Sequence, residues 1–233
     1  DDDPLVRFLK DGSFLFASER SGWKHLYRYD KDGKLRQQLT CGEWECRGVS
    51  RVDEAAGVVF VTGTMDSPIA ENLYRVKLDG SEIRRLTHEP GTHRTSVASA
   101  GDLFIDSWSS RERPARVALR SLQDGAMVRM LDTNPVRELE KFQLAASTQL
   151  QITTPDGFGL EATLVKPPDF DPAKKYPVWF MTYAGPHAPV VRDTWSGAGP
   201  ARVLDQALAT AGILAFRADP RSASGKGAVS AWT

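Results

Sequence analysis

The chain has 233 residues, 41% of them hydrophobic and 26% charged, which is enough for two modest globular domains or one large one. Thirty Lys and Arg balance thirty Asp and Glu, so the formal net charge is zero, which argues against a nucleic-acid binder or a protein held on anionic membranes. No apolar run approaches the roughly eighteen residues of a membrane-spanning helix, so no membrane segment is expected.

An internal repeat dominates the first half of the chain. Leu-Tyr-Arg at 26–28 and Leu-Thr at 39–40 recur 47 residues later, at 73–75 and 86–87. A more divergent third copy covers 103–131. Each copy holds short apolar or alternating runs separated by Asp-Gly turns, which predicts three small antiparallel sheets.

A repeat of this length, built from about four strands, is typical of a β-propeller blade. Such a sheet cannot bury both of its faces alone and must stack against neighbours, and complete rings usually hold about four to eight blades. Only three copies are present. We therefore predict that residues 1–133 are blades of a β-propeller that is incomplete within this chain.

Two cysteines, Cys41 and Cys46, lie in this region, without the His and Cys spacing that would complete a zinc site. They could bridge across the turn at 42–45, but two free or partly buried thiols are the favoured interpretation. Gly-Lys-Gly at 225–227 lacks the spacing of a phosphate-binding loop. We expect no cofactor and no metal.

The pattern changes after residue 133. Residues 134–146 are interpreted as a charged connector. Alternating residues predict strands at 149–153 and 160–164, and the Thr-Pro-Asp-Gly sequence at 154–157 predicts a turn between them.

A strand–helix–strand unit is expected next. Residues 178–183 read Val-Trp-Phe-Met-Thr-Tyr, which predicts a strand buried on both faces of a parallel sheet. Pro200 and Gly212 mark the start and end of a helix whose apolar residues repeat at spacings of three and four. A second buried strand at 213–216 completes the unit. Two central strands are too few for a stable parallel sheet, so residues 147–233 are predicted to form an incomplete α/β domain, and the fold class is mixed β and α/β.

Several short stretches, in one consistent order along almost the whole chain, carry a family resemblance. They are Ser18–Tyr27, Leu39–Thr40, Gly42–Glu45, Pro68–Tyr74, Leu86–Thr87, Lys166–Pro172, Lys174–Val178 and Tyr183–His187. The last of these, Tyr-Ala-Gly-Pro-His, is the most specific. In these stretches the chain resembles the prolyl oligopeptidase superfamily, and within it the dipeptidyl peptidase IV branch.

The resemblance implies an eight-bladed propeller followed by a C-terminal α/β-hydrolase domain. This chain would cover the last three blades and, in residues 147–233, the N-terminal part of the hydrolase. It also implies a serine peptidase that cleaves short peptides after proline, often releasing N-terminal dipeptides, so the implied partner is a peptide substrate. A homodimer of the complete protein and an extracytoplasmic location are further implications of the family, while the sequence itself leaves the compartment open.

The catalytic triad of such a peptidase is not found in the chain. In α/β-hydrolases the nucleophile lies in a Gly-x-Ser-x-Gly elbow, and the carboxylate and the histidine follow it in sequence. Ser196 and Ser224 lack the flanking glycines. Because the elbow is absent, we expect this chain alone to be inactive. The alternative is a propeller-based binding or scaffold protein with a degenerate hydrolase-like tail.

Tyr183 is the one catalytic candidate. The resemblance implies that its hydroxyl points into the oxyanion hole, where a phenol at the end of a strand can donate a hydrogen bond. The structural alternative is that its ring only plugs the strand end. His187 precedes any triad serine and is interpreted as a loop residue. The remaining histidines are expected to pack in the propeller or to lie on its surface; they are His25, His88 and His93.

Overall fold

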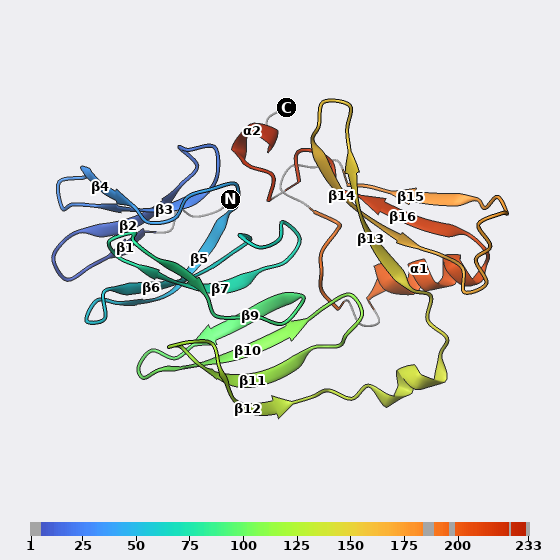
Figure 1. Ribbon diagram of the computed structural model, residues 1–233, viewed down its shortest axis with the longest axis horizontal. Helices are drawn as coiled ribbons and strands as arrows, with labels where there is room; N and C mark the ends of the chain where they lie inside the picture. The colour runs from blue at the N-terminus through green and yellow to red at the C-terminus, as the bar shows by residue number, and fades with distance from the viewer. Residues whose placement is uncertain (1–5, 184–188, 196–198, 224, 232–233) are drawn as a thin grey trace.

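The computed structural model describes residues 6–183, 189–195, 199–223 and 225–231. Four sheets of four strands each follow one another along the chain (Figure 1). The first three are antiparallel and contain consecutive strands, and the fourth is mixed, with the order β13-β14-β16-β15. The described part of the chain holds no helix long and apolar enough to cross a membrane.

The three repeats predicted from the sequence form the three antiparallel sheets, an arrangement consistent with part of a propeller. Leu-Tyr-Arg lies in the third strand of each of the first two sheets, and the third copy begins at the second strand of its sheet. The strands are β1 Val6–Phe8, β2 Phe14–Ser18, β3 His25–Tyr29, β4 Leu35–Gln38, β5 Cys46–Asp53, β6 Val58–Gly63, β7 Asn72–Lys77, β8 Ile83–Arg85, β9 Thr92–Val97, β10 Leu103–Ser109, β11 Arg116–Ser121 and β12 Met127–Asp132.

The Leu-Thr pairs that recur 47 residues apart form the same hydrogen bonds in both sheets. The Thr40 hydroxyl oxygen accepts the backbone N–H of Leu26 at 2.9 Å, and the Thr87 hydroxyl oxygen accepts that of Leu73 at 3.1 Å. The N–H of Leu39 donates to the carbonyl of Leu26, and that of Leu86 donates to the carbonyl of Leu73, both at 2.8 Å. Each Leu-Thr pair therefore closes its sheet against the Leu-Tyr-Arg strand.

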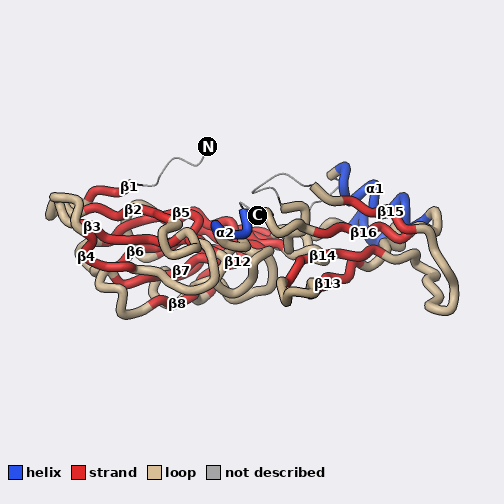
Figure 2. The backbone as a smooth tube through the Cα atoms, turned by 90° about the horizontal axis from the view of Figure 1, so that it is seen from above, coloured by secondary structure: helices blue, strands red, loops and turns tan. Residues whose placement is uncertain are grey.

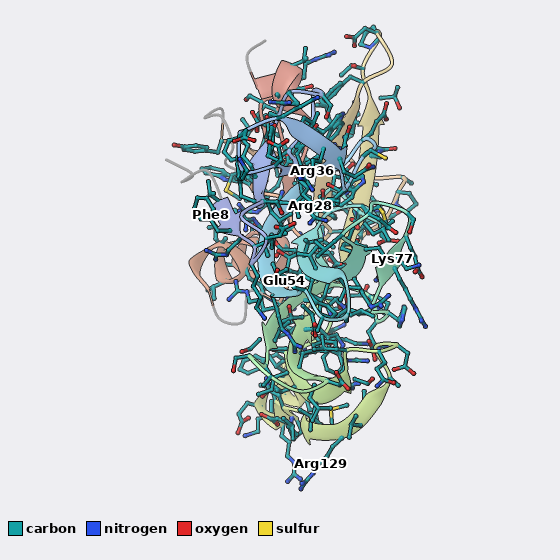
Figure 3. All side chains as sticks on the ribbon, turned by 90° about the vertical axis from the view of Figure 1, so that its left-hand side faces the viewer. Phe8, Arg28, Arg36, Glu54, Lys77 and Arg129 are labelled. Atoms are coloured by element: carbon teal, nitrogen blue, oxygen red, sulfur yellow. The ribbon has the colours of Figure 1, made fainter. Side chains whose placement is uncertain are left out.

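Alternation along β6 places the second sheet between two cores. Val59 and Val61 pack with residues of the first sheet, whereas Val58 and Phe60 pack toward the third. Because successive side chains of a strand point to opposite faces, one strand supplies both cores. The sheets stack in this order (Figure 1), and the view from above shows the first two sheets on one side of the molecule and the fourth sheet with α1 on the other (Figure 2). Charged side chains such as Lys77 and Arg129 point outward from the sheets (Figure 3).

The second half begins with a short 3-10 helix, Arg137–Lys141, that buries none of its residues. The elements that follow it are β13 Ser147–Thr153, β14 Gly159–Val165, β15 Val178–Met181, α1 Pro200–Thr210, β16 Leu214–Ala218 and α2 Ala228–Ala231. β15 and β16 are parallel neighbours joined through α1, so the strand–helix–strand prediction is confirmed. The helix ends before Gly212, whose φ of +77° lies in the left-handed region.

The prediction that residues 178–183 are buried on both faces is wrong for this chain. The strand ends at Met181, and Val178, Trp179 and Phe180 are 57%, 50% and 57% exposed. β15 is the edge strand of the sheet, and α1 packs on β14 and β16 rather than on β15. The second strand of the unit, β16, is also only partly buried.

Candidate functional site

Tyr183 lies two residues beyond β15, at the carboxyl end of the parallel pair. Met181 is in register with Arg217, so the chain leaves β15 and β16 at the same edge of the sheet. The side chain of Tyr183 is 57% exposed. In α/β sheets, the carboxyl edge of the strands is where ligands usually bind.

Asp219 follows β16 directly and fixes a second segment at the same edge. Its carboxylate accepts the backbone N–H of Val190 at 2.6 Å and that of Val191 at 3.2 Å, and its own N–H donates to the carbonyl of Glu161 at 2.9 Å. Burial raises the pKa of the Asp219 carboxyl, against the opposing effect of the two N–H donors. The segment 189–195, which begins six residues after Tyr183, is thus attached to the end of β16.

The same segment, 189–195, also contacts the blades. The N–H of Asp193 donates to the carbonyl of Ile69 at 2.9 Å, and the Asp193 carboxylate accepts the N–H of Arg111 at 2.9 Å. The hydroxyl of Ser109 accepts the N–H of Trp195 at 3.0 Å. Hydrogen bonds from the second and third blades therefore hold the chain on the carboxyl side of β15.

The loop after β16 is held by the hairpin of β13 and β14. Arg221 forms an ion pair with Asp156, and the Lys226 ammonium lies 3.3 Å from a carboxylate oxygen of Glu161. Hydrogen bonds from the Thr154 hydroxyl and then from Arg221 lower the pKa of Asp156 to about 2. Arg221 and Lys226 of this loop thus both face carboxylates of the hairpin.

A cavity of about 540 Å³ lies between the third blade, the connector and α1. Four arginines line it, Arg192 among them. Of the other three, Arg217 pairs with Asp205 at 2.8 Å, the Arg202 guanidinium lies 3.8 Å from the centre of the Trp195 ring, and Arg111 donates to the Ser147 hydroxyl at 2.8 Å. Burial lowers the pKa of Arg111 and of Arg202. The sequence analysis missed this cluster because its members are separated by long stretches of sequence and no motif joins them.

Both cysteines are free thiols, in agreement with the favoured interpretation. Cys41 is exposed, while Cys46 is buried, and burial raises the pKa of its thiol to about 12. A thiol with so high a pKa carries almost no thiolate at neutral pH, so it is not a nucleophile. Among the described residues, no group of three or more His, Cys, Asp and Glu side chains is placed to hold a metal ion.

The histidines of the propeller have the packing and surface roles expected of them. His25 is buried and lies 3.1 Å from the Thr40 hydroxyl, His93 is buried against Asp106 at 2.9 Å, and His88 is exposed. The three other residues considered for catalysis lie outside the described residues; they are His187, Ser196 and Ser224.

Comparisons with known proteins agree with the arrangement of the sheets. Residues 2–115 match the family model described as the dipeptidyl peptidase IV (DPP IV) N-terminal region. The chain is 31% identical over 187 residues to dipeptidyl peptidase 4 of Arthroderma otae, a match that covers 78% of this chain and 24% of that protein. It is 28% identical to dipeptidyl peptidase 8 of Homo sapiens, over 92% of this chain and 27% of that protein.

The crystal structure of Porphyromonas gingivalis dipeptidyl peptidase 4 is similar to 97% of this chain, with a TM-score of 0.87 and 28% sequence identity, and the match covers 31% of that chain. This chain spans about a quarter of the length of the curated relatives it matches. The family-model match lies within the part of the chain that holds the repeated sheets, whereas the structural match covers nearly the whole chain. The chain is dipeptidyl peptidase IV-like, and its residues 2–115 are the part that matches the N-terminal region of that family.

Proposed function

We propose that this chain is part of a serine peptidase that acts on short peptides and releases N-terminal X-Pro dipeptides. The relatives named above are dipeptidyl peptidases, which supports peptide hydrolysis. The observation that carries the proposal is the place of Tyr183: an exposed phenol at the carboxyl end of a parallel strand, next to two loops that are fixed by hydrogen bonds. A pure scaffold has no use for such a group.

The proposal divides the chain into blades at 1–133, a connector at 134–146 and the first part of an α/β-hydrolase domain at 147–233. The end of β12 at Asp132 and the start of β13 at Ser147 support these boundaries. A parallel pair joined by a helix supports the hydrolase assignment. A homodimer of the complete protein stays a prediction from the family resemblance.

In the proposed reaction, Tyr183 donates its hydroxyl hydrogen to the oxygen that becomes negative when the peptide carbonyl is attacked. Such donors act mainly in the transition state, because the charge develops only there. The sequence holds no Gly-x-Ser-x-Gly elbow. The nucleophile, the carboxylate and the histidine would therefore come from residues of the complete protein that this chain does not contain.

The test uses a complete protein that contains this chain and an X-Pro dipeptide amide with a chromogenic leaving group. Tyr183→Phe should lower kcat by about two to three orders of magnitude, with little change in KM or in the melting temperature. Tyr176→Phe is the matched control, because the Tyr176 oxygen only accepts the N–H of Asp171 in a loop before β15, at 2.8 Å. Equal turnover by the Tyr183 variant would reject the oxyanion role, and no hydrolysis by the unaltered protein would favour the scaffold alternative.

A further inference from the structure

The loop at 219–228 runs from the carboxyl end of β16 to α2 and passes between the fourth sheet and the first two blades (Figure 1). Its contacts to the β13–β14 hairpin, through Arg221 and Lys226, hold one side of the loop. A second set of contacts joins it to the blades. Those contacts bridge segments that are far apart in the sequence, and none of their groups takes part directly in the bond-breaking step proposed above.

One carboxylate of the second blade reaches the backbone of this loop. An oxygen of Glu45 accepts the N–H of Gly225 at 2.7 Å, across 180 residues of sequence. Three residues later, the N–H of Ala228 donates to the carbonyl of Gly22, in the first blade, at 2.8 Å. Both neighbouring blades therefore hold the loop, and Glu45 makes the charge-assisted contact, the stronger kind of hydrogen bond.

The glycines of Gly-Lys-Gly, which matched no phosphate-binding motif, are explained by this contact. Gly225 and Gly227 both have φ of +83°, in the left-handed region. A Cβ on Gly225 would lie 2.9 Å from the carbonyl oxygen of Pro68, and one on Gly227 would lie 3.0 Å from that of Gly22. Only glycine lets the loop backbone approach the blades this closely.

The Glu45 carboxylate is itself held in place. The backbone N–H of Glu45 donates to the Thr64 hydroxyl at 3.0 Å, and its carbonyl accepts the N–H of Thr64 at 3.1 Å. The other carboxylate oxygen lies 3.5 Å from Nε of Arg47. The residues on either side, Trp44 and Cys46, are buried in the core between the first two blades. Glu45 is thus a rigid acceptor rather than a flexible surface side chain.

We infer that Glu45 is a positioning residue: it fixes the loop after β16 so that the carboxyl edge carrying Tyr183 keeps its reactive geometry. This inference rests on the proposed peptidase function. The loop starts at Asp219, whose carboxylate holds Val190 and Val191, so displacement of the loop would be transmitted to the segment after β15. Misplacement of reacting groups by about 1 Å can cost roughly a hundredfold in rate.

The test compares three variants of the complete protein on the X-Pro dipeptide amide. Glu45→Ala removes the acceptor and should lower kcat roughly ten- to a hundredfold while KM changes little. Glu45→Gln keeps an acceptor oxygen at the same place and should restore most of kcat. Glu43→Ala is the matched control, since Glu43 is exposed two residues away and should leave kcat unchanged. Hydrogen exchange of the peptide containing Gly225 should speed up in Glu45→Ala alone.

The outcomes separate this inference from the function on which it rests. If the unaltered protein hydrolyses the substrate but Glu45→Ala retains kcat within twofold, only the inference is overturned. It is also overturned if Gln is as damaging as Ala, because the acceptor would then not matter, or if the kcat loss follows a fall in melting temperature. If the unaltered protein does not hydrolyse the substrate, the proposed function fails, and accelerated exchange at Gly225 would then report a structural contact without a catalytic role.

Discussion

Asp106→Asn keeps the shape of a buried side chain while removing its charge, and so measures what an ion network contributes to the third blade. The Asp106 carboxylate lies 2.9 Å from Nδ1 of His93 and 2.8 Å from Nε of Arg120, and the side chains of Asp106 and His93 are fully buried. The asparagine amide would keep one acceptor oxygen but would remove the negative charge that faces the Arg120 guanidinium. Removing one partner of a buried pair costs about 3–5 kcal/mol.

Arg120 has two other partners that remain in the variant. We therefore expect the loss in the free energy of unfolding to lie at the lower end of that range. The Nη2 of Arg120 lies 2.5 Å from Glu89, and its Nη1 donates to the carbonyl of Gly125 at 3.1 Å. We therefore expect Asp106→Asn to lower the free energy of unfolding by about 3 kcal/mol. The ring of Trp108, one of six tryptophans, stacks on His93 with centroids 6.1 Å apart, so tryptophan fluorescence includes a signal from this blade.

Urea unfolding followed by tryptophan fluorescence gives the comparison. Asp102→Asn is the matched control on the preceding turn of the same blade, where the carboxylate is exposed, and it should change the free energy by no more than about 0.5 kcal/mol. The slope against urea should be the same for both variants, because the surface exposed on unfolding is unchanged. A loss below about 1 kcal/mol in Asp106→Asn, comparable with the control, would refute the claim that the charge is needed.

Two further predictions concern the second half of the chain. The Asp156 carboxyl should titrate with a pKa of about 2, against an ordinary value of 3.8, and Arg221→Gln should raise this pKa in a carbon-detected NMR titration. Because the pKa is depressed in the folded state, the contact stabilises the fold above pH 3.8, and this stabilisation is lost as the pH falls through about 2. An unchanged pKa in the variant would show that Arg221 does not act on this group. The 233-residue chain should remain unlabelled by a fluorophosphonate probe that labels the complete protein, because the chain has no nucleophile elbow, and stoichiometric labelling of the chain would contradict this reading.

The blades could be predicted because their signals are local and repeated. Leu-Thr at 39–40 and 86–87 forms the same hydrogen bonds to Leu26 and Leu73, so one structural solution appears twice in the sequence. The helix from Pro200 was predictable for a similar reason, because its ends and its apolar spacing lie within a few residues of each other. Local sequence patterns of this kind predict a strand or a helix and, where they repeat, the strand with which it pairs.

Periodicity does not report what lies on the other side of an element. The run at 178–180 has the composition of a buried strand, yet its exposure depends on the position of β15 in the sheet order and on where α1 packs. The Glu45–Gly225 hydrogen bond spans 180 residues and ends on a backbone N–H, which has no side-chain signature. In the sequence, this contact is marked by the two glycines of Gly-Lys-Gly. Their role follows from the structure, which places them against the carbonyls of Pro68 and Gly22.

The contacts between the blades and the carboxyl edge have a common form that bears on how the family can vary. Asp193 and Ala228 each donate a backbone N–H to a blade carbonyl, and neither bond depends on a particular side chain. Glu45 and Ser109 are different, because each supplies a side-chain acceptor to a loop backbone. A change at either acceptor therefore removes a point at which the blades hold a loop backbone. The segments after β15 and β16 are thus held both by the fourth sheet, through Asp219, and by the blades, through backbone carbonyls and the side chains of Glu45 and Ser109.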